Sequence, residues 1–288
     1  MFENVIVGVD GRPAGRDAIE LARRLVSPQG KLTLANVHSG ELSPVNAVTP
    51  GLPAGEREAS HELLQRERDD ADLGADAVEL VSFAALSPGR GLHDLAEERG
   101  ADLLVVGTCS RGMLGRAMLG DDTRAALNGA PCAVAIAARG YAEHPLPLAS
   151  IGVGYDGSPE SEAALAAARA VAAQQRAKLV ALEVVSIPAY SFTGLTPPAL
   201  GDTIDALITD AKEQLRTLED VEGRAVYGLP GEELAAFSAD VNLLVVGSRN
   251  YGPLRRLVVG STSGYLERHA RCSLLALPRG AGAQKADN

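Results

Sequence analysis

Aromatic residues are scarce in this chain of 288 residues, and tryptophan is absent. Only 3% of the residues are aromatic, so few side chains could stack on nucleic-acid bases. The net charge of −10 also argues against a broad surface for the phosphates of a nucleic acid. The composition therefore makes nucleic acid an unexpected partner.

Long apolar runs and cysteines are also few. No apolar run approaches the roughly 18 residues that a membrane-spanning helix needs, so no contact with a membrane is expected. The start of the chain, MFENVIVGVDG, has no basic segment or cleavage pattern, so no secretory signal is expected. Three cysteines do not make a disulfide framework, which fits a reducing, cytoplasmic location. The five histidines show no metal-ligand spacing, so no metal site is expected.

The chain does contain a long internal repeat. A repeat of this length indicates two duplicated domains, which we place at residues 1–144 and 145–288. The boundary falls where Gly and Pro residues interrupt the pattern, near Arg139–Leu148. The matching pairs are Val5–Leu25 with Ser150–Val171, Leu103–Asp121 with Leu243–Ser261, and Ala130–Ala137 with Ala270–Leu277.

Each half alternates apolar runs, typical of buried strands, with segments of helical periodicity. In the first half we expect strands at Val5–Val9, Lys31–Val37, Ala77–Phe83, Leu103–Val106 and Cys132–Ala137. The expected helices are Pro13–Val26, closed by Gly30, then Arg57–Leu73 after a loop at His38–Gly55, Leu92–Glu98, and a last helix from Thr123. In the second half we expect strands near Gly152–Gly154, Leu179–Val185, Ala225–Tyr227, Leu243–Val246 and Cys272–Leu277.

This alternation predicts an α/β fold of two tandem doubly wound domains, each a five-stranded parallel sheet between helices. The fifth strand of each domain would lie at a sheet edge, where unpaired backbone groups invite pairing. We therefore expect Cys132–Ala137 and Cys272–Leu277 to join the halves as a pseudo-dimer, and the chain to form a homo-oligomer.

Sheets of this kind bind ligands outside the carboxyl ends of their strands, at the point where the strand order reverses. Polar residues and glycines follow several of the expected strands at this edge. Asp10 and Asp156 follow the first strand of each half, and Gly107 and Gly247 follow the fourth. Downstream of Gly247, the stretch Gly260–Ser263 leads into a helix. The first amides of a helix have no partner within it and favour an anion. We interpret this stretch as a phosphate cradle.

Together these residues resemble the universal stress protein family, in tandem form. The resemblance depends on Asp-Gly after the first strand, Gly-x2-Gly-x9-Gly-Ser/Thr after the fourth, and Pro-Cys or a similar pair before the last strand. It implies an adenine nucleotide alpha hydrolase-like fold. It also implies ATP as the ligand of nucleotide-binding members, and Mg²⁺ could accompany the phosphates. In those members the acid contacts adenine, a residue ending the second strand contacts the base or ribose, and the glycine loop holds the phosphates.

The resemblance implies a nearly intact site in the second half. Asp156 matches the adenine-contacting acid and Val184 the position on the second strand. Asn250 departs from the pattern, which has glycine there, although asparagine tolerates positive φ better than most residues. The loop positions are Gly247, Asn250, Gly260 and Ser261, followed by Thr262.

The first half matches the pattern less well. Asp10 and Val37 match the base-side positions, and Gly107 and Gly120 are in register. Ser110 replaces the second glycine, and Asp121 and Asp122 stand where Ser or Thr is expected. Carboxylates repel a triphosphate most strongly where water is excluded. We therefore expect ATP in the second domain and weak binding or none in the first.

Structural roles remain open for several of these residues. Asp10 and Asp156 could simply cap the helices that follow them. Cys132 and Cys272 begin equivalent strands and are best interpreted as core residues, while a redox role for Cys109 has no support. The arginines of the two loops could steer phosphate but fit a solvated face better; they are Arg111, Arg116, Arg249, Arg255 and Arg256.

Three functions remain open at this point. The first is an ATP-binding stress-response regulator without a dedicated catalytic step. The second is a nucleotide-independent interaction module, and the third a weak nucleotide hydrolase or nucleotidyl transferase. Gly30-Lys31 is followed by Leu32 rather than Ser or Thr, so it is not a Walker loop. No Gly-x-Gly-x-x-Gly follows the first strand and no Gly-x-Ser-x-Gly occurs, and no nucleophile, base and orienting acid fall together.

Overall fold

The computed structural model describes residues 2–39, 52–75, 77–108, 125–187, 197–248, 257 and 260–278. The strands of the first half are β1 (Phe2–Gly8), β2 (Val26–His38), β3 (Val78–Ala84), β4 (Leu103–Gly107) and β5 (Ala133–Ala137). Its helices are α1 (Pro13–Leu25), α2 (Leu52–Asp70) and α3 (Pro88–Arg99), and residues 125–127 are also helical.

The second half repeats this order of elements. Its strands are β6 (Ser150–Gly154), β7 (Lys178–Val185), β8 (Glu222–Tyr227), β9 (Leu243–Gly247) and β10 (Ser273–Leu277). Its helices are α5 (Pro159–Gln175), α6 (Pro197–Arg216), α7 (Pro230–Phe237) and α8 (Ser261–His269). None of the helices in the described ranges is long and apolar enough to cross a bilayer.

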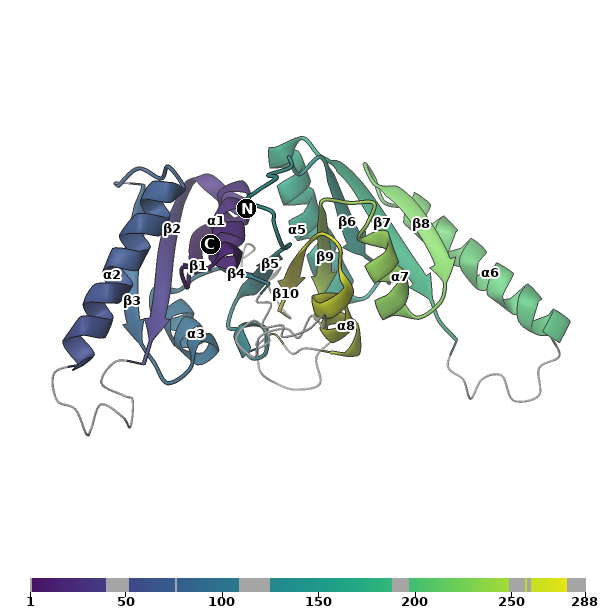
Figure 1. Cartoon of the computed structure of the whole chain (residues 1–288). Helices are drawn as coiled ribbons and strands as arrows, with labels where there is room; N and C mark the ends of the chain where they lie inside the picture. Colours follow the sequence, from purple (N-terminus) through teal and green to yellow (C-terminus); the bar gives the residue numbers. More distant parts are fainter. Residues whose placement is uncertain are drawn as a thin grey trace.

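All these strands form a single ten-stranded sheet in the order β3-β2-β1-β4-β5-β10-β9-β6-β7-β8. Neighbouring strands are parallel within each half, and β5 and β10 meet antiparallel, with Leu275 opposite Ala135. Figure 1 shows the two strands side by side in the middle of the molecule, between the purple-blue half and the green half. The predicted tandem α/β fold is confirmed, and the two fifth strands join the halves as expected.

Helices cover both faces of the sheet, which explains why its central strands are apolar without alternation. One hydrophobic cluster holds residues of α1, α2, α5 and α6, and the other holds residues of α3, α7 and α8. Each cluster draws on both halves of the chain. All residues of β4, β5 and β10 are buried, and so is every residue of β9 before Gly247. The hydrophobic core is therefore continuous across the junction.

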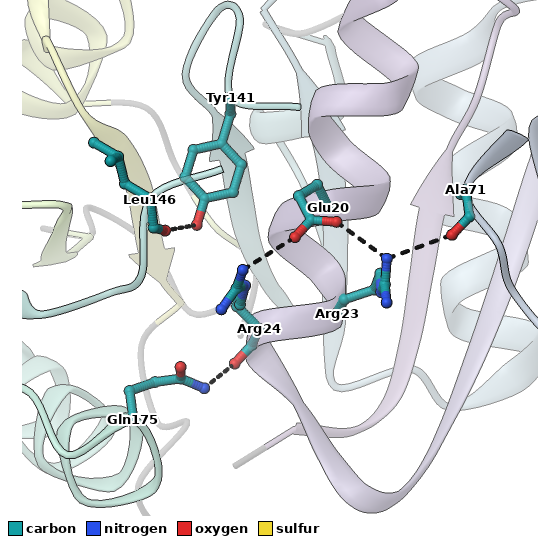
Figure 2. Close-up of polar contacts among 7 residues, drawn as sticks. All are labelled: Glu20, Arg23, Arg24, Ala71, Tyr141, Leu146 and Gln175. Atoms are coloured by element: carbon teal, nitrogen blue, oxygen red, sulfur yellow. Dashed lines mark hydrogen bonds and ion pairs between the residues drawn. The ribbon is translucent and has the colours of Figure 1, made fainter. Parts of the chain in front are cut away.

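Further contacts tie the two halves together beside the sheet. Figure 2 shows the side-chain amide of Gln175, at the end of α5, donating to the carbonyl oxygen of Arg24 on α1, at 2.8 Å. The amide of Ala138 donates to Oγ of Ser273 at 3.1 Å. The linker is held as well, because the buried carboxylate of Asp17 accepts hydrogen bonds from Gly140 N and Ala142 N, at 2.9 and 2.8 Å.

Several predicted boundaries were wrong. Gly30 does not close the first helix, because α1 ends at Leu25 and β2 begins at Val26. The register between β1 and β2 shifts after the pair Phe2 and Val26, and Gly30 lies in this irregular part. A Cβ on Gly30 would come within 3.1 Å of the carbonyl oxygen of Phe2, so glycine serves the close approach of two strands.

Helices α2 and α3 also begin earlier than predicted, at Leu52 and Pro88 rather than Arg57 and Leu92. The start of α3 has a local cause. Ser87 is the N-cap residue, its Oγ accepts a hydrogen bond from Arg90 N at 3.4 Å, and Pro88 follows in the first turn. Proline fits there because its missing N–H would have no partner in the helix. The predicted start of the next helix, Thr123, lies outside the described residues.

We predict that Leu275→Ala destabilises the whole chain. Leu275 is fully buried at the junction and packs in the cluster shared by both halves, so its truncation should cost about 2–5 kcal/mol. Urea unfolding followed by circular dichroism measures the loss. Leu207→Ala, on a helix position that is 37% exposed, is the control and should change stability by less than about 1 kcal/mol. Equal losses in the two variants would contradict the role given to the junction.

Candidate functional site

Two cavities lie at equivalent places in the two halves, at the carboxyl ends of the strands. The strand order reverses between β1 and β4 in the first half and between β6 and β9 in the second, so each cavity opens at a switch point. Both cavities therefore lie at the edge of the sheet where the sequence predicts a ligand site. The two cavities differ in size and lining.

The second-half cavity has a volume of about 480 Å³, within the usual range for a small-molecule site. It brings together six of the residues singled out from the sequence, namely Asp156, Val184, Gly247, Gly260, Ser261 and Thr262. Asn250 lies outside the described residues. The other described lining residues are Gly154, Tyr155, Ser158, Glu160, Ser161, Leu182, Pro230, Leu234, Val246 and Ser263.

The N-terminus of α8 forms one wall of this cavity. Gly260 is the N-cap residue, and its amide donates a hydrogen bond to Oγ of Ser263 at 2.9 Å. The amides of Ser261 and Thr262 belong to the first turn, in which a helix offers no acceptor for them. Hydroxyls of Ser261 and Thr262 lie at the same wall. This wall therefore presents hydrogen-bond donors and the positive end of a helix dipole.

Asp156 also lines the cavity and organises the chain beside it. Its Oδ1 accepts hydrogen bonds from the hydroxyl of Ser158 and, at 3.2 Å, from the amide of Ser158. Ser158 in turn is the N-cap of α5 and accepts from Ser161 N at 3.2 Å. The alternative that the aspartates cap the following helices is therefore wrong, because the N-cap residues are Ser158 and Arg12; Asp156 instead holds the cap residue Ser158. This role does not exclude ligand contact, because a carboxylate offers about four acceptor positions.

The glycines of the predicted loop occur at their positions for different physical reasons. A Cβ on Gly247 would lie 2.4 Å from the carbonyl oxygen of Glu160, and one on Gly107 would lie 1.9 Å from that of Ala14. Both glycines therefore allow a strand end to approach the first turn of a helix. Gly260 makes no such contact with the described residues, since its φ is −79° and the nearest described atom to an added Cβ, Oγ of Ser263, is 4.0 Å away. Gly260 lines the cavity.

The first-half cavity is much smaller, at about 90 Å³. It collects Asp10, Val37 and Gly107, as the sequence predicted, while Gly120, Ser110, Asp121 and Asp122 lie outside the described residues. Asp10 accepts from Arg12 N at 3.2 Å and forms an ion pair with the same arginine at 3.5 Å. The other described lining residues are mainly small or apolar, namely Gly8, Val9, Ala14, Gly15, Ala35, Asn36, Pro88, Leu92 and Val106.

Two polar residues of the second cavity were missed by the sequence analysis. Glu160 and Ser161, on the first turn of α5, line it, whereas the first half has Ala14 and Gly15 at the matching positions. The internal repeat carried this signal, because the two sequences could have been compared position by position after the aspartate. The second cavity is thus the more polar as well as the larger.

Glu183 is a second residue that the sequence analysis missed. It occupies the position on β7 that Asn36 holds on β2, as the equivalent pairings of Gly154 with Leu182 and Gly8 with Ala35 show. Asn36 Nδ2 donates to the carbonyl oxygen of Val9 at 2.7 Å, which an ionised carboxylate cannot do. Burial, and secondarily the charge of Asp156, raise the pKa of Glu183, and its buried Oε2 has no hydrogen-bond partner among the described residues.

Cys132 is buried in the core, as predicted, and Cys272 is partly buried and packs against the same cluster. Burial raises the pKa of both thiols to about 12, so neither is a ready nucleophile. Cys109 lies outside the described residues, as do the loop arginines Arg111, Arg116, Arg249, Arg255 and Arg256. Within the described ranges, no group of three or more His, Cys, Asp or Glu residues could hold a metal ion.

With this geometry in view, the comparisons with known proteins identify the family. The model of the universal stress protein family matches residues 1–138 and 148–278. The chain belongs to the universal stress protein family. It is 28% identical over 291 residues to a universal stress protein of Mycobacterium tuberculosis H37Rv, which covers 94% of this chain and 95% of the relative.

Other universal stress proteins match less of the chain or share the fold alone. A second one from Mycobacterium tuberculosis H37Rv is 32% identical over 183 residues, and the match spans 61% of each chain. The crystal structure of a universal stress protein from Archaeoglobus fulgidus DSM 4304 superposes with a TM-score of 0.63 at 15% identity, covering 96% of this chain and 98% of that one. The similarity therefore extends over both halves.

We predict opposite outcomes for alanine at two glycines of this universal stress protein site. Gly247→Ala forces a Cβ against the carbonyl oxygen of Glu160 and should lower the free energy of unfolding by about 1–3 kcal/mol. Gly260→Ala enters open space at an ordinary φ and should stay within about 1 kcal/mol of wild type. Thermal unfolding of the ligand-free protein checks both values. A large loss of stability in Gly260→Ala would contradict this prediction, because it would mean that Gly260 is needed for packing.

Glu183→Gln should stabilise the protein at neutral pH. The raised pKa of Glu183 means that burying its charged form costs stability above that pKa, whereas below the ordinary value of 4.5 the residue is neutral in both states. The gain from Glu183→Gln should therefore be present at pH 7–8 and vanish as the pH falls below about 4.5.

Asn36→Asp in the first domain is the matched control for this experiment. It places a carboxylate where Asn36 now donates to Val9, so it should destabilise the protein most at neutral pH. Urea unfolding across the pH range measures both variants. A gain from Glu183→Gln that is the same at every pH would contradict the assignment of a penalty to the charge.

Proposed function

We propose that the second domain binds ATP and that the protein acts as a stress-response regulator through nucleotide occupancy. The observation that carries the proposal is the cavity of about 480 Å³, whose lining combines an acid, Asp156, with the N-terminus of a helix, α8. An adenine nucleotide has the complementary chemistry, with an amino group and an apolar ring at one end and anionic oxygens at the other.

The base end of the proposed complex is formed by strand ends. Leu182 and Val184 on β7 and Val246 on β9 line the cavity and give an apolar surface for a purine ring. Asp156 lines the same cavity and can accept a hydrogen bond from an exocyclic amino group. An acceptor at this point favours adenine over guanine, which presents a carbonyl oxygen at the corresponding position of its ring.

The phosphate end is formed by the first turn of α8. The amides and hydroxyls of Ser261 and Thr262 supply donors, and the helix dipole adds a positive potential. Gly260 lets a phosphate approach the backbone closely. This would explain a glycine at a position where the packing of the described residues does not require one. Mg²⁺ could balance the charge of the phosphates, since both charged residues among the described cavity lining, Asp156 and Glu160, are acidic.

We propose that ATP is held rather than turned over. Asp156 of the described lining is already engaged by Ser158, and no His, Cys or Lys lines this part of the cavity. A bound nucleotide would instead change the surface that a partner meets at this edge of the sheet. Steady phosphate release by wild type, well above that of Asp156→Ala, would favour a hydrolase instead.

Paired substitutions in the two domains test the proposal. Asp156→Ala should weaken ATP binding by at least about tenfold, because it removes a hydrogen bond to the base from a desolvated site. Asp10→Ala removes the matching acid from the small first-domain cavity and should leave the Kd unchanged. Each variant loses one hydrogen bond to a following backbone amide and one contact with the side chain of that same residue, so general effects on folding are similar. Isothermal titration calorimetry measures the affinities.

The ligand itself can be identified directly. Protein purified from the native host is denatured, and the released small molecules are analysed by mass spectrometry. We expect an adenine nucleotide in the wild type and a much smaller amount in Asp156→Ala. Absence of nucleotide, together with no ATP binding by calorimetry, would favour the nucleotide-independent interaction module.

A further inference from the structure

We propose that the first domain positions the phosphate end of the nucleotide site in the second domain, through a backbone pairing between Leu257 and the turn at Gly129 and Ala130. The inference depends on the proposed function, since it concerns the same site. It assigns a role in ATP binding to a turn of the first domain, although the cavity of that domain is small.

The pairing consists of two backbone hydrogen bonds between the domains. The amide of Leu257 donates to the carbonyl oxygen of Ala130 at 2.9 Å, and the amide of Gly129 donates to the carbonyl oxygen of Leu257 at 2.8 Å. Leu257 thus has both backbone groups satisfied by the first domain. Backbone groups in the interior need such partners, because leaving one unpaired costs more than a hydrogen bond gains.

The side chain of Leu257 reinforces the pairing. It is completely buried, with 0% of its surface exposed. It belongs to the hydrophobic cluster that includes Leu127 and Ala130 of the first domain and Leu266 of α8 in the second. Both the backbone and the side chain therefore hold this residue at the boundary between the domains.

The position of Leu257 bears directly on the proposed phosphate site. Gly260, the N-cap of α8, follows it by three residues, a length that can span no more than roughly 10 Å. Fixing Leu257 therefore restricts where the first turn of α8 begins. A donor wall that is held in place before the ligand arrives binds more tightly, because less ordering accompanies binding.

The turn in the first domain has a geometry that depends on glycine. Gly129 has a φ of +94°, a conformation that residues with a Cβ rarely adopt. An added Cβ would meet nothing closer than the ring of His93 at 3.8 Å, so an alanine there would suffer from backbone strain and not from a clash. Gly129→Ala is therefore a way to disturb the turn from a position outside the cavity.

The chain offers a matched control for this substitution. Gly100, which ends α3 in the same domain, also has a positive φ of 60°, and an added Cβ would meet no atom within 4 Å. Gly100→Ala therefore introduces a similar strain without touching Leu257. Any effect that only Gly129→Ala produces reports on the pairing between the domains.

Two measurements on the full chain test the inference. Hydrogen exchange followed by mass spectrometry reports whether the segment containing Leu257 is protected, and calorimetry gives the Kd for ATP. Gly129→Ala should accelerate exchange in that segment and raise the Kd by about tenfold. Gly100→Ala should leave both at the wild-type values. Should Gly129→Ala not fold, Leu257→Ala replaces it and is expected to raise the Kd by about fivefold.

The outcomes separate this inference from the proposed function. Faster exchange around Leu257 with an unchanged Kd would overturn the positioning role while ATP binding stands. An equal rise of the Kd in Gly100→Ala would overturn it too, because the effect would then come from general strain. A wild-type protein that binds no ATP would instead overturn the proposed function, and the positioning role with it.

Discussion

The antiparallel pairing of β5 with β10 is the interaction on which the rest of the structure depends. It turns two five-stranded parallel sheets into one sheet of ten strands and buries both fifth strands completely. An edge strand with no partner would expose backbone donors and acceptors. Because the repeat is covalently linked, each half always finds its partner edge. The contacts of Gln175 with Arg24 and of Leu257 with Ala130 form around this junction.

The same junction explains how two similar domains can differ without losing the fold. Both domains keep the aspartate after the first strand and the glycine after the fourth, and the glycines are required by the close approach of strand and helix backbones. The side chains that line the cavities can differ between the domains, because the close contact is made mainly by backbone atoms of the helix turn. The first domain has Ala14 and Gly15 where the second has Glu160 and Ser161, and its cavity is correspondingly less polar. One domain then stabilises and positions, and the other binds, in the function proposed here.

Much of the fold could be predicted because the repeat and the apolar runs are strong signals. The Leu-Leu-Val-Val-Gly runs of β4 and β9 and the repeated aspartates predicted the strands and the edge of the sheet at which the cavities open. Boundaries such as Gly30 could not be predicted, since a register shift between β1 and β2 is a tertiary feature. The reason for Gly247 was also missed, because the carbonyl of Glu160 beside it comes from another element. The pairing of Leu257 with a turn in the other domain leaves no pattern in the local sequence.

The central claim is that the two similar domains have separated into a binding domain and a supporting domain. Native mass spectrometry of the full chain at increasing ATP concentration tests it most directly, because it counts the nucleotides bound to each chain. The account predicts that the spectrum saturates at one ATP per chain. Saturation at two, or no bound nucleotide at any concentration, would contradict it.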